Sequence, residues 1–208
     1  MTIKISRRPL LLGGAALVLA GCSGGAKGAA EGDMALGAPE GAKVTVVEYA
    51  SVTCPHCALW QANTWPAFKA KYVDTNKVRY VFRELPTPPA EIAAAGFLMA
   101  RCAGPDKYFE VIHELLANQA EWQSGAISPR ASLVKTAGGF GISETQFQEC
   151  VTDEKAVAAL EKRVQAAVAA GVTGTPTFVV NGKTVAYTGG EGPPMPILEA
   201  AIEPELAK

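Results

Sequence analysis

Two cysteines separated by two residues, in the segment Cys54-Pro55-His56-Cys57, are the residues of this sequence best suited to chemistry. Thiols at this spacing can close a small disulfide ring, and such a ring can exchange with the thiols of another protein. If a helix begins here, its free N–H groups and positive dipole end favour a thiolate at Cys54. His56 can add a positive charge or a hydrogen bond. Because Cys57 lies one turn deeper, we expect Cys54 to attack and Cys57 to resolve the mixed disulfide.

The same cysteine pair has two other interpretations, half of a zinc site or a static disulfide. A structural zinc ion needs four ligands. The remaining candidates, which are His56, His113, Cys102 and Cys150, contain no second closely spaced pair. We therefore expect no metal and no cofactor, and we favour the redox interpretation.

Glu48 is the next candidate, because it interrupts the apolar, β-branched run at residues 43–50. A carboxyl buried among such residues must be neutral or hydrogen-bonded. Desolvation would raise its pKa, which suits proton transfer near neutral pH. The alternative is that strand alternation turns Glu48 toward solvent.

The elements that must position these residues follow from hydrophobic patterns. Residues 43–50 and 77–85 are expected as strands, and a helix is expected from Cys54, with Pro55 in its first turn and a bend at Pro66. A long helical stretch follows; in it Ser143 and Gln146 form a capping-box pattern. Strands are expected again at 177–180 and 183–187, around the hairpin signal Asn181-Gly182, before a closing helix.

The first 21 residues are excluded from the fold because they are typical of an export signal. A positive start precedes an apolar run, residues 9–20, that is too short to span a bilayer. The run ends at Leu19-Ala20-Gly21-Cys22, which resembles a bacterial lipobox, so Cys22 is expected to carry lipid. The segment Ser6–Leu11 partly matches a twin-arginine signal. An ordinary cleaved signal with an incidental cysteine is the alternative. Residues 22–37, rich in Gly and Ala, are expected to form a flexible tether.

The cysteines number five, at positions 22, 54, 57, 102 and 150. With Cys22 lipidated and Cys54 near Cys57, Cys102 and Cys150 remain for each other. A disulfide between them would persist in an oxidising compartment. The alternative is that both are free, buried thiols.

The overall composition excludes one class of partner. The 208 residues, 49% of them hydrophobic, suffice for one domain with an insertion. The 19 basic and 20 acidic residues nearly balance, and phosphate binding needs concentrated basic charge, so nucleic acid is not expected as a partner.

The Cys54–Cys57 motif after an apolar strand, together with Gly174-Thr175-Pro176-Thr177-Phe178, resembles the thioredoxin superfamily. The Cys-Pro-His-Cys tetrapeptide and the helical stretch are similar to its disulfide-bond-protein-A (DsbA) branch. The resemblance implies an α/β thioredoxin fold with an inserted α-helical domain. Its two thioredoxin parts are expected at 38–87 and 171–208, and the insertion at 88–170.

The resemblance also implies roles for individual residues. The Thr175–Pro176 bond is expected to be cis and to face the active-site disulfide, so that the Thr175 backbone can bind an extended substrate by strand addition. An ordinary trans proline is the alternative. Glu48 matches the family's buried acid, which relays protons to and from the resolving cysteine.

The function expected from these features is that of a periplasmic, lipid-anchored oxidase. It would donate the Cys54–Cys57 disulfide to reduced exported proteins and would be reoxidised by a quinone-linked membrane partner. The alternatives are a reductase or isomerase, or a non-enzymatic module that binds metal or a partner. Isomerases of this kind dimerise through an extra domain, which residues 24–37 are too short to form, so a monomer is expected.

Overall fold

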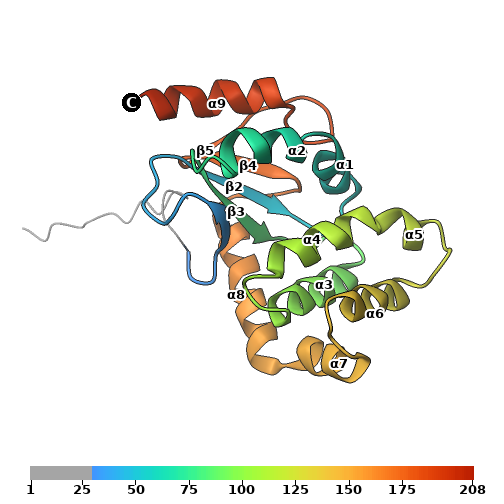
Figure 1. Ribbon diagram of the computed structural model, residues 1–208. Helices are drawn as coiled ribbons and strands as arrows, with labels where there is room; N and C mark the ends of the chain where they lie inside the picture. Colours follow the sequence, from blue (N-terminus) through green and yellow to red (C-terminus); the bar gives the residue numbers. More distant parts are fainter. Residues whose placement is uncertain (1–29) are drawn as a thin grey trace, which may run out of the picture.

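The computed structural model describes residues 30–208, and within them the core is a five-stranded mixed sheet. Its strands are β1 (Met34–Gly37), β2 (Thr45–Ala50), β3 (Arg79–Glu84), β4 (Thr177–Val180) and β5 (Lys183–Thr184). Their order across the sheet is β1-β3-β2-β4-β5 (Figure 1). Only β2 and β3 run parallel; the other neighbouring pairs are antiparallel. The central strand β2 ends at Ala50, and a turn of three residues leads from it to Cys54.

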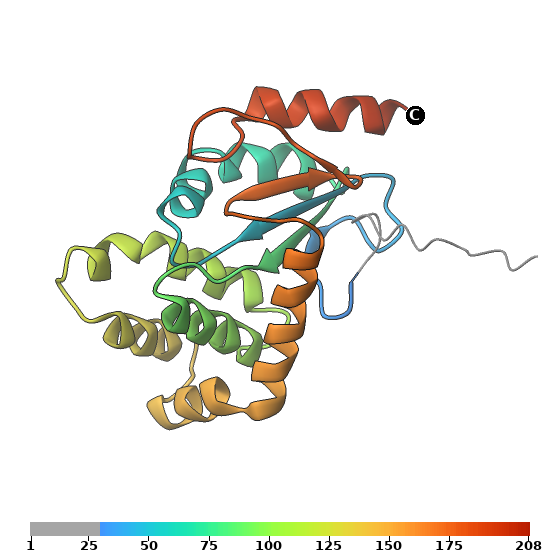
Figure 2. The same ribbon diagram turned by 180° about the vertical axis from the view of Figure 1, so that it is seen from behind.

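Strand alternation divides the sheet into two buried faces. Val46 and Phe82 face one way and pack with Trp60 of α1 (Pro55–Asn63) and Leu198 of α9 (Met195–Ala207). Between α1 and β3 the chain forms α2 (Trp65–Phe68) and a π-helical turn, η1 (Lys69–Val73). The opposite face packs against α8 (Glu154–Ala169), as Figure 2 shows from behind. The sheet is therefore covered on both sides.

All the regular secondary structure between β3 and β4 is helical. Its helices are α3 (Ala90–Cys102), α4 (Tyr108–Ala117), α5 (Gln119–Gln123), α6 (Pro129–Gly139), α7 (Glu144–Thr152) and α8. Most of them form a body beside the sheet (Figure 1). This arrangement confirms the predicted fold class, a thioredoxin fold with an inserted helical domain.

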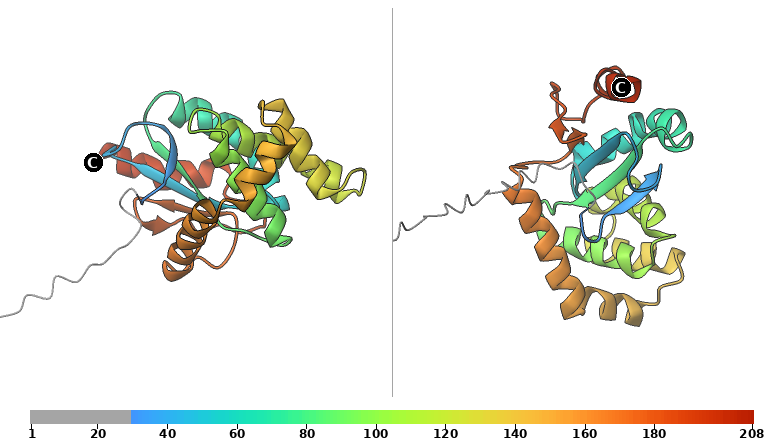
Figure 3. Two further views of the ribbon diagram at one scale, coloured as in Figure 1. Left: turned by 90° about the horizontal axis from the view of Figure 1, so that it is seen from below. Right: turned by 90° about the vertical axis from the view of Figure 1, so that its left-hand side faces the viewer.

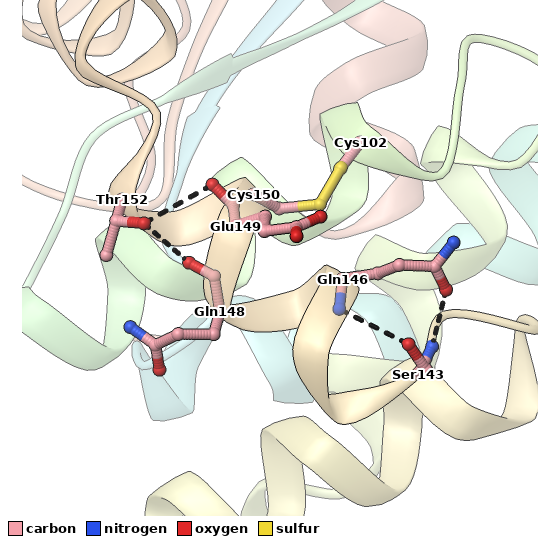
Figure 4. The surroundings of a disulfide bond; sticks show 7 residues. All are labelled: Cys102, Ser143, Gln146, Gln148, Glu149, Cys150 and Thr152. Atoms are coloured by element: carbon pink, nitrogen blue, oxygen red, sulfur yellow. Dashed lines mark hydrogen bonds between the residues drawn. A yellow bond between two sulfur atoms is a disulfide. The ribbon is translucent and has the colours of Figure 1, made fainter.

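A disulfide joins two helices of this inserted body. Cys102, at the end of α3, is bonded to Cys150 of α7, with their Cα atoms 6.0 Å apart (Figure 4). In the same view Ser143 caps α7: its hydroxyl accepts from the Gln146 N–H, and the Gln146 side chain accepts from the Ser143 N–H. The structure thus has both the bond and the capping box expected from the sequence.

The predicted tether, residues 22–37, is wrong over its last four residues. Met34–Gly37 pairs with β3 as an edge strand, seen beside β3 in Figure 3. Asp33 also accepts two hydrogen bonds from the Arg83 guanidinium, both at 2.9 Å. Backbone pairing and this ion pair order a segment whose residues (Met, Ala, Leu and Gly) are neither β-branched nor aromatic and so gave no strand signal. The predicted signal peptide and the lipidation site at Cys22 lie outside the described residues.

Two other details differ from the expectations. The first helix breaks at Thr64, before Pro66, because Pro66 occupies the first turn of the new helix α2. The second hairpin strand is only Lys183–Thr184 and ends before Tyr187. Within residues 30–208, no helix has both the length and the apolar character needed to cross a membrane.

Candidate active site

Cys54 caps the N-terminus of α1. Its backbone is extended (φ −83°, ψ 117°), and its sulfur accepts a hydrogen bond from the Cys57 N–H at 3.4 Å. Pro55 follows at the first helical position, where its missing N–H removes no helical hydrogen bond. The sulfur is thus held over the positive end of the helix.

The loop before β4 supplies a second contact to the same sulfur. The Cys54 thiol donates to the Thr175 carbonyl oxygen at 3.4 Å, and the Thr175–Pro176 bond is cis. Pro176 is buried, whereas Thr175 is half-buried. Residues 121 positions apart in sequence therefore meet at the reactive atom.

The hydrogen-bond donors around Cys54 favour its thiolate. The pKa of Cys54 is lowered to about 5, first by a hydrogen bond from the Cys57 side chain, then by the Thr175 side chain and by the Cys57 and His56 backbone. Partial burial opposes this shift. Near neutral pH, a reduced Cys54 is therefore an anion.

Cys57 has the opposite environment. Its side chain is fully buried, and burial raises its pKa well above that of an ordinary thiol, with further contributions from the Cys54 and Glu48 charges. Cys54 retains 5% exposure and Cys57 none. The pair thus combines a slightly exposed residue whose thiol is acidic with a fully buried one whose thiol stays neutral.

Glu48 is buried in β2, with 2% of its surface exposed, which excludes the solvent-facing alternative. The Tyr80 hydroxyl donates a hydrogen bond to its carboxyl. Desolvation raises the pKa of Glu48 to about 8, although the hydrogen bond from Tyr80 opposes the rise. The charges of Glu48 and Cys57 also influence one another, so the carboxyl is electrostatically coupled to the resolving thiol.

His56 is exposed at the start of α1, and its ring lies against the backbone of Gly190. A Cβ atom added at Gly190 would lie 2.6 Å from the His56 Cε1 atom, so a larger residue there would displace the His56 ring. The Trp60 indole N–H donates to the Pro193 carbonyl oxygen of the same loop at 3.0 Å. The loop after β5 thus packs against α1 at both His56 and Trp60.

Two residues of the site were not predicted from the sequence. The Tyr187 hydroxyl donates to the Pro176 carbonyl oxygen at 2.5 Å, which ties the hairpin end to the loop that contacts Cys54. Gln119, from the insertion, donates to the carbonyl oxygens of Val52 and Cys54. Tyr187 acts through one hydrogen bond and Gln119 through two, each to another segment of the chain. No local sequence pattern signals such contacts. His113, a conceivable zinc ligand, instead lies edge-to-face against Trp65, and no cluster of three potential metal ligands occurs among residues 30–208.

Comparisons with known proteins agree with this geometry. A family model described as thioredoxin matches residues 29–191. A Rickettsia bellii protein, provisionally named a protein-disulfide oxidoreductase, is 35% identical over 153 residues, which cover 73% of this chain. The match covers 58% of that protein, so the chain spans little more than half the length of this relative.

Solved structures share the fold over most of their length. The crystal structure of Wolbachia pipientis alpha-DsbA1 has a TM-score of 0.74 and 25% identity, covering 86% of this chain and 94% of the other. Oxidised BdbD from Bacillus subtilis has a TM-score of 0.74 and 22% identity, covering 88% and 97%. The sheet and the inserted helices are thus common to these proteins.

Proposed function

The chain belongs to the thioredoxin family, and from that premise we propose that it is a DsbA-like thiol–disulfide oxidoreductase that works as a dithiol oxidase. Its active-site disulfide, Cys54–Cys57, would be transferred to exported proteins. The rival direction is reduction or isomerisation by the same pair of sulfurs.

The proposal that the protein works as an oxidase rests on the anionic character of Cys54. Contacts that lower the pKa of Cys54 to about 5 stabilise the reduced form of the pair. A stabilised reduced form makes the corresponding disulfide oxidising. A reductase needs the reverse balance, in which the disulfide is the preferred state.

The first step is attack by a substrate thiolate on the Cys54 sulfur. Cys54 is the more exposed residue of the pair, since Cys57 is fully buried. The Cys54–Cys57 bond breaks as the bond from substrate to Cys54 forms, and Cys57 leaves with the electron pair. Because the pKa of Cys57 is raised far above neutrality, this sulfur takes up a proton.

A second substrate thiolate then attacks the substrate sulfur of the mixed disulfide. The substrate disulfide forms and Cys54 leaves as the thiolate, which its low pKa makes a good leaving group. Two electrons have passed from the substrate to the Cys54–Cys57 pair. A quinone-linked membrane oxidant would remove them and restore the disulfide.

Glu48 is proposed to move the proton of Cys57. With a pKa near 8, its buried carboxyl is mostly protonated at neutral pH and can supply a proton as Cys57 leaves. In reoxidation the carboxylate would accept the proton from Cys57. The Thr175 and Pro176 backbone is proposed to bind the substrate chain beside Cys54, and His56 to add to the stabilisation of the thiolate.

The proposed setting is the periplasm or cell envelope, with the domain as a monomer held to a membrane through lipid on Cys22. Reduced exported proteins would be its substrates. Mass spectrometry of the mature N-terminus tests the anchor, because an unmodified start at another residue would contradict it.

The experiment that tests the oxidase direction is equilibration of the protein in glutathione buffers. The reduced fraction of Cys54 and Cys57 is measured by alkylation and mass, and Cys102 and Cys150 serve as internal controls. We expect a disulfide less stable than that of glutathione. A more stable disulfide would point to a reductase.

A further inference from the structure

Gln119 is the one buried residue of the short helix α5, with 2% of its surface exposed. A primary amide in such a position is costly unless its donors and acceptor are used. Its partners therefore indicate why glutamine stands there.

The amide of Gln119 joins the insertion to the active-site loop. Its nitrogen donates to the Val52 carbonyl oxygen at 2.8 Å and to the Cys54 carbonyl oxygen at 3.1 Å. Its oxygen accepts from the Gln123 side chain at 3.1 Å. Two carbonyl acceptors on one side require the NH₂ group there, so the orientation of the amide is settled by its partners.

A second contact from the insertion reaches the same loop. Gly96 of α3 lies so close to Val52 that an added Cβ atom would be 2.9 Å from its Cγ2 atom and 3.2 Å from Leu115 Cδ1. Val52 is thus held by packing from α3 and by hydrogen bonding from α5. Val52 lies two residues before Cys54, in the turn that sets the start of α1.

We propose that Gln119 is a positioning residue for thiol–disulfide exchange, which from the insertion fixes the Val52 and Cys54 carbonyls and so the turn that presents the Cys54 sulfur. This inference rests on the proposed function and deepens it. It gives the inserted domain a part in the chemistry, through a residue that need not touch the substrate.

The physical reason lies in the carbonyl dipoles beside the sulfur. The Cys54 carbonyl also accepts the helical hydrogen bond from the Ala58 N–H at 3.2 Å. An amide donor on each carbonyl offsets the negative oxygen ends that would otherwise disfavour a nearby thiolate. It also maintains the extended backbone of Cys54, which directs the sulfur to the Cys57 N–H.

The test compares the pH titration of Cys54 in four variants of the reduced protein. The ultraviolet absorbance of the thiolate reports the titration. Gln119→Met keeps the size and shape of the side chain and removes both donors. Gln119→Glu replaces the donors with a carboxyl that repels both carbonyls when ionised. Gln123→Met is the matched control, since it removes the outer hydrogen bond and leaves the two donations. Phe147→Leu controls for lost stability, because Phe147 is buried in α7 of the insertion.

We expect Gln119→Met to raise the pKa of Cys54 by about half a unit to one unit, which lowers its thiolate fraction at pH 5 about two- to fivefold. Gln119→Glu should raise the pKa of Cys54 at least as much. This second variant provides the test if Gln119→Met does not fold. Gln123→Met and Phe147→Leu should titrate like the original protein.

An unchanged titration in a folded Gln119→Met variant would overturn the positioning role, as would an equal shift in Phe147→Leu. Failure of the proposed function gives a different result, because Cys54 would then titrate as an ordinary thiol before any substitution.

Discussion

The Tyr80 hydroxyl donates a hydrogen bond to the Glu48 carboxyl inside the sheet, where both side chains are buried. Tyr80 on β3 pairs with Val46 of β2, two residues before Glu48, so the two side chains are diagonal neighbours on one face. The bond favours the ionised carboxyl, while desolvation disfavours it. Tyr80 therefore helps to keep the pKa of Glu48 near 8, within reach of neutral pH.

The first prediction concerns Tyr80→Phe, which removes only the hydroxyl. We expect the pKa of Glu48 to rise by about one unit, since a hydrogen bond to the charged form is lost. The pH profile of Cys57-dependent exchange should shift upward by the same amount. Stopped-flow exchange with a model dithiol, measured from pH 6 to pH 10, checks this; an unshifted profile would mean that Tyr80 does not act through Glu48.

Glu48→Gln is expected to stabilise the fold but to slow thiol–disulfide exchange. Because the pKa of Glu48 is higher in the folded chain than in the unfolded one, its contribution to stability is full below the ordinary carboxyl pKa and is lost as pH rises through about 8. A neutral glutamine should therefore stabilise the fold at pH 8 by roughly 1 to 3 kcal/mol. Exchange should slow about tenfold or more, as expected when a proton carrier is removed. Urea unfolding at pH 5 and pH 8 measures the first effect, and a pH-independent difference would contradict it.

Cys57→Ala should trap substrates on Cys54. A mixed disulfide formed at Cys54 can no longer be resolved from within, so exported proteins should remain attached, as seen by mass spectrometry of non-reduced samples. The pKa of Cys54 should also rise, because the Cys57 side chain is the largest cause of its lowering; it should stay below that of an ordinary thiol, because the backbone donors remain. The paired control Cys54→Ala should give no adducts, and adducts on Cys57 in that variant would reverse the assignment.

The sequence predicted those parts of the fold and site that depend on local chemistry. Cys54 at a helix start, the Ser143 capping box and the Asn181-Gly182 turn all depend on residues within a few positions of one another. Glu48 was recognisable because an acid in an apolar strand is unusual. Such signals survive because their partners are nearby in the chain.

Contacts between distant segments could not be predicted in the same way. Gln119 meets Val52 across 67 positions, and Glu84 meets Arg163 across 79. Strand β1 depends on pairing with β3, since it contains no β-branched or aromatic residue and its own strand preference is weak. Which residues of a helix are buried also depends on what packs against it: in α8 only Leu160 and Ala167 are buried, whereas Val168 is 60% exposed.

Removal of the Cys102–Cys150 bond is expected to weaken the fold and leave the active-site chemistry intact. The bond closes a loop with a sequence separation of 48, for which the chain-entropy estimate is roughly 4 kcal/mol. The double variant Cys102→Ser/Cys150→Ser should lose about 2 to 4 kcal/mol of unfolding free energy in urea. Its Cys54 titration should be unchanged, because neither residue is among the groups that shift the pKa of Cys54.

The last prediction concerns Glu84, whose side chain is fully buried at the junction of sheet and insertion. Its carboxyl accepts from Arg101 Nε of α3 at 2.5 Å, from Arg163 Nε of α8 at 2.6 Å and from the Tyr108 hydroxyl at 3.1 Å. Both guanidinium groups are about four-fifths buried, so each depends on this carboxylate to offset its desolvation.

Glu84→Gln keeps the shape of the side chain but leaves two cations without their counter-charge. We expect a loss of roughly 2 to 4 kcal/mol of unfolding free energy. This loss is smaller than for a fully buried ion pair, because both arginines retain some exposure. Glu31→Gln is the matched control: its ion pair with Lys162 is exposed on both sides, so the loss of unfolding free energy should be much smaller than for Glu84→Gln. Urea unfolding of both variants at neutral pH measures the difference. Equal, small losses would show that the buried pairs contribute no more than surface ones and that packing alone holds the insertion to the sheet.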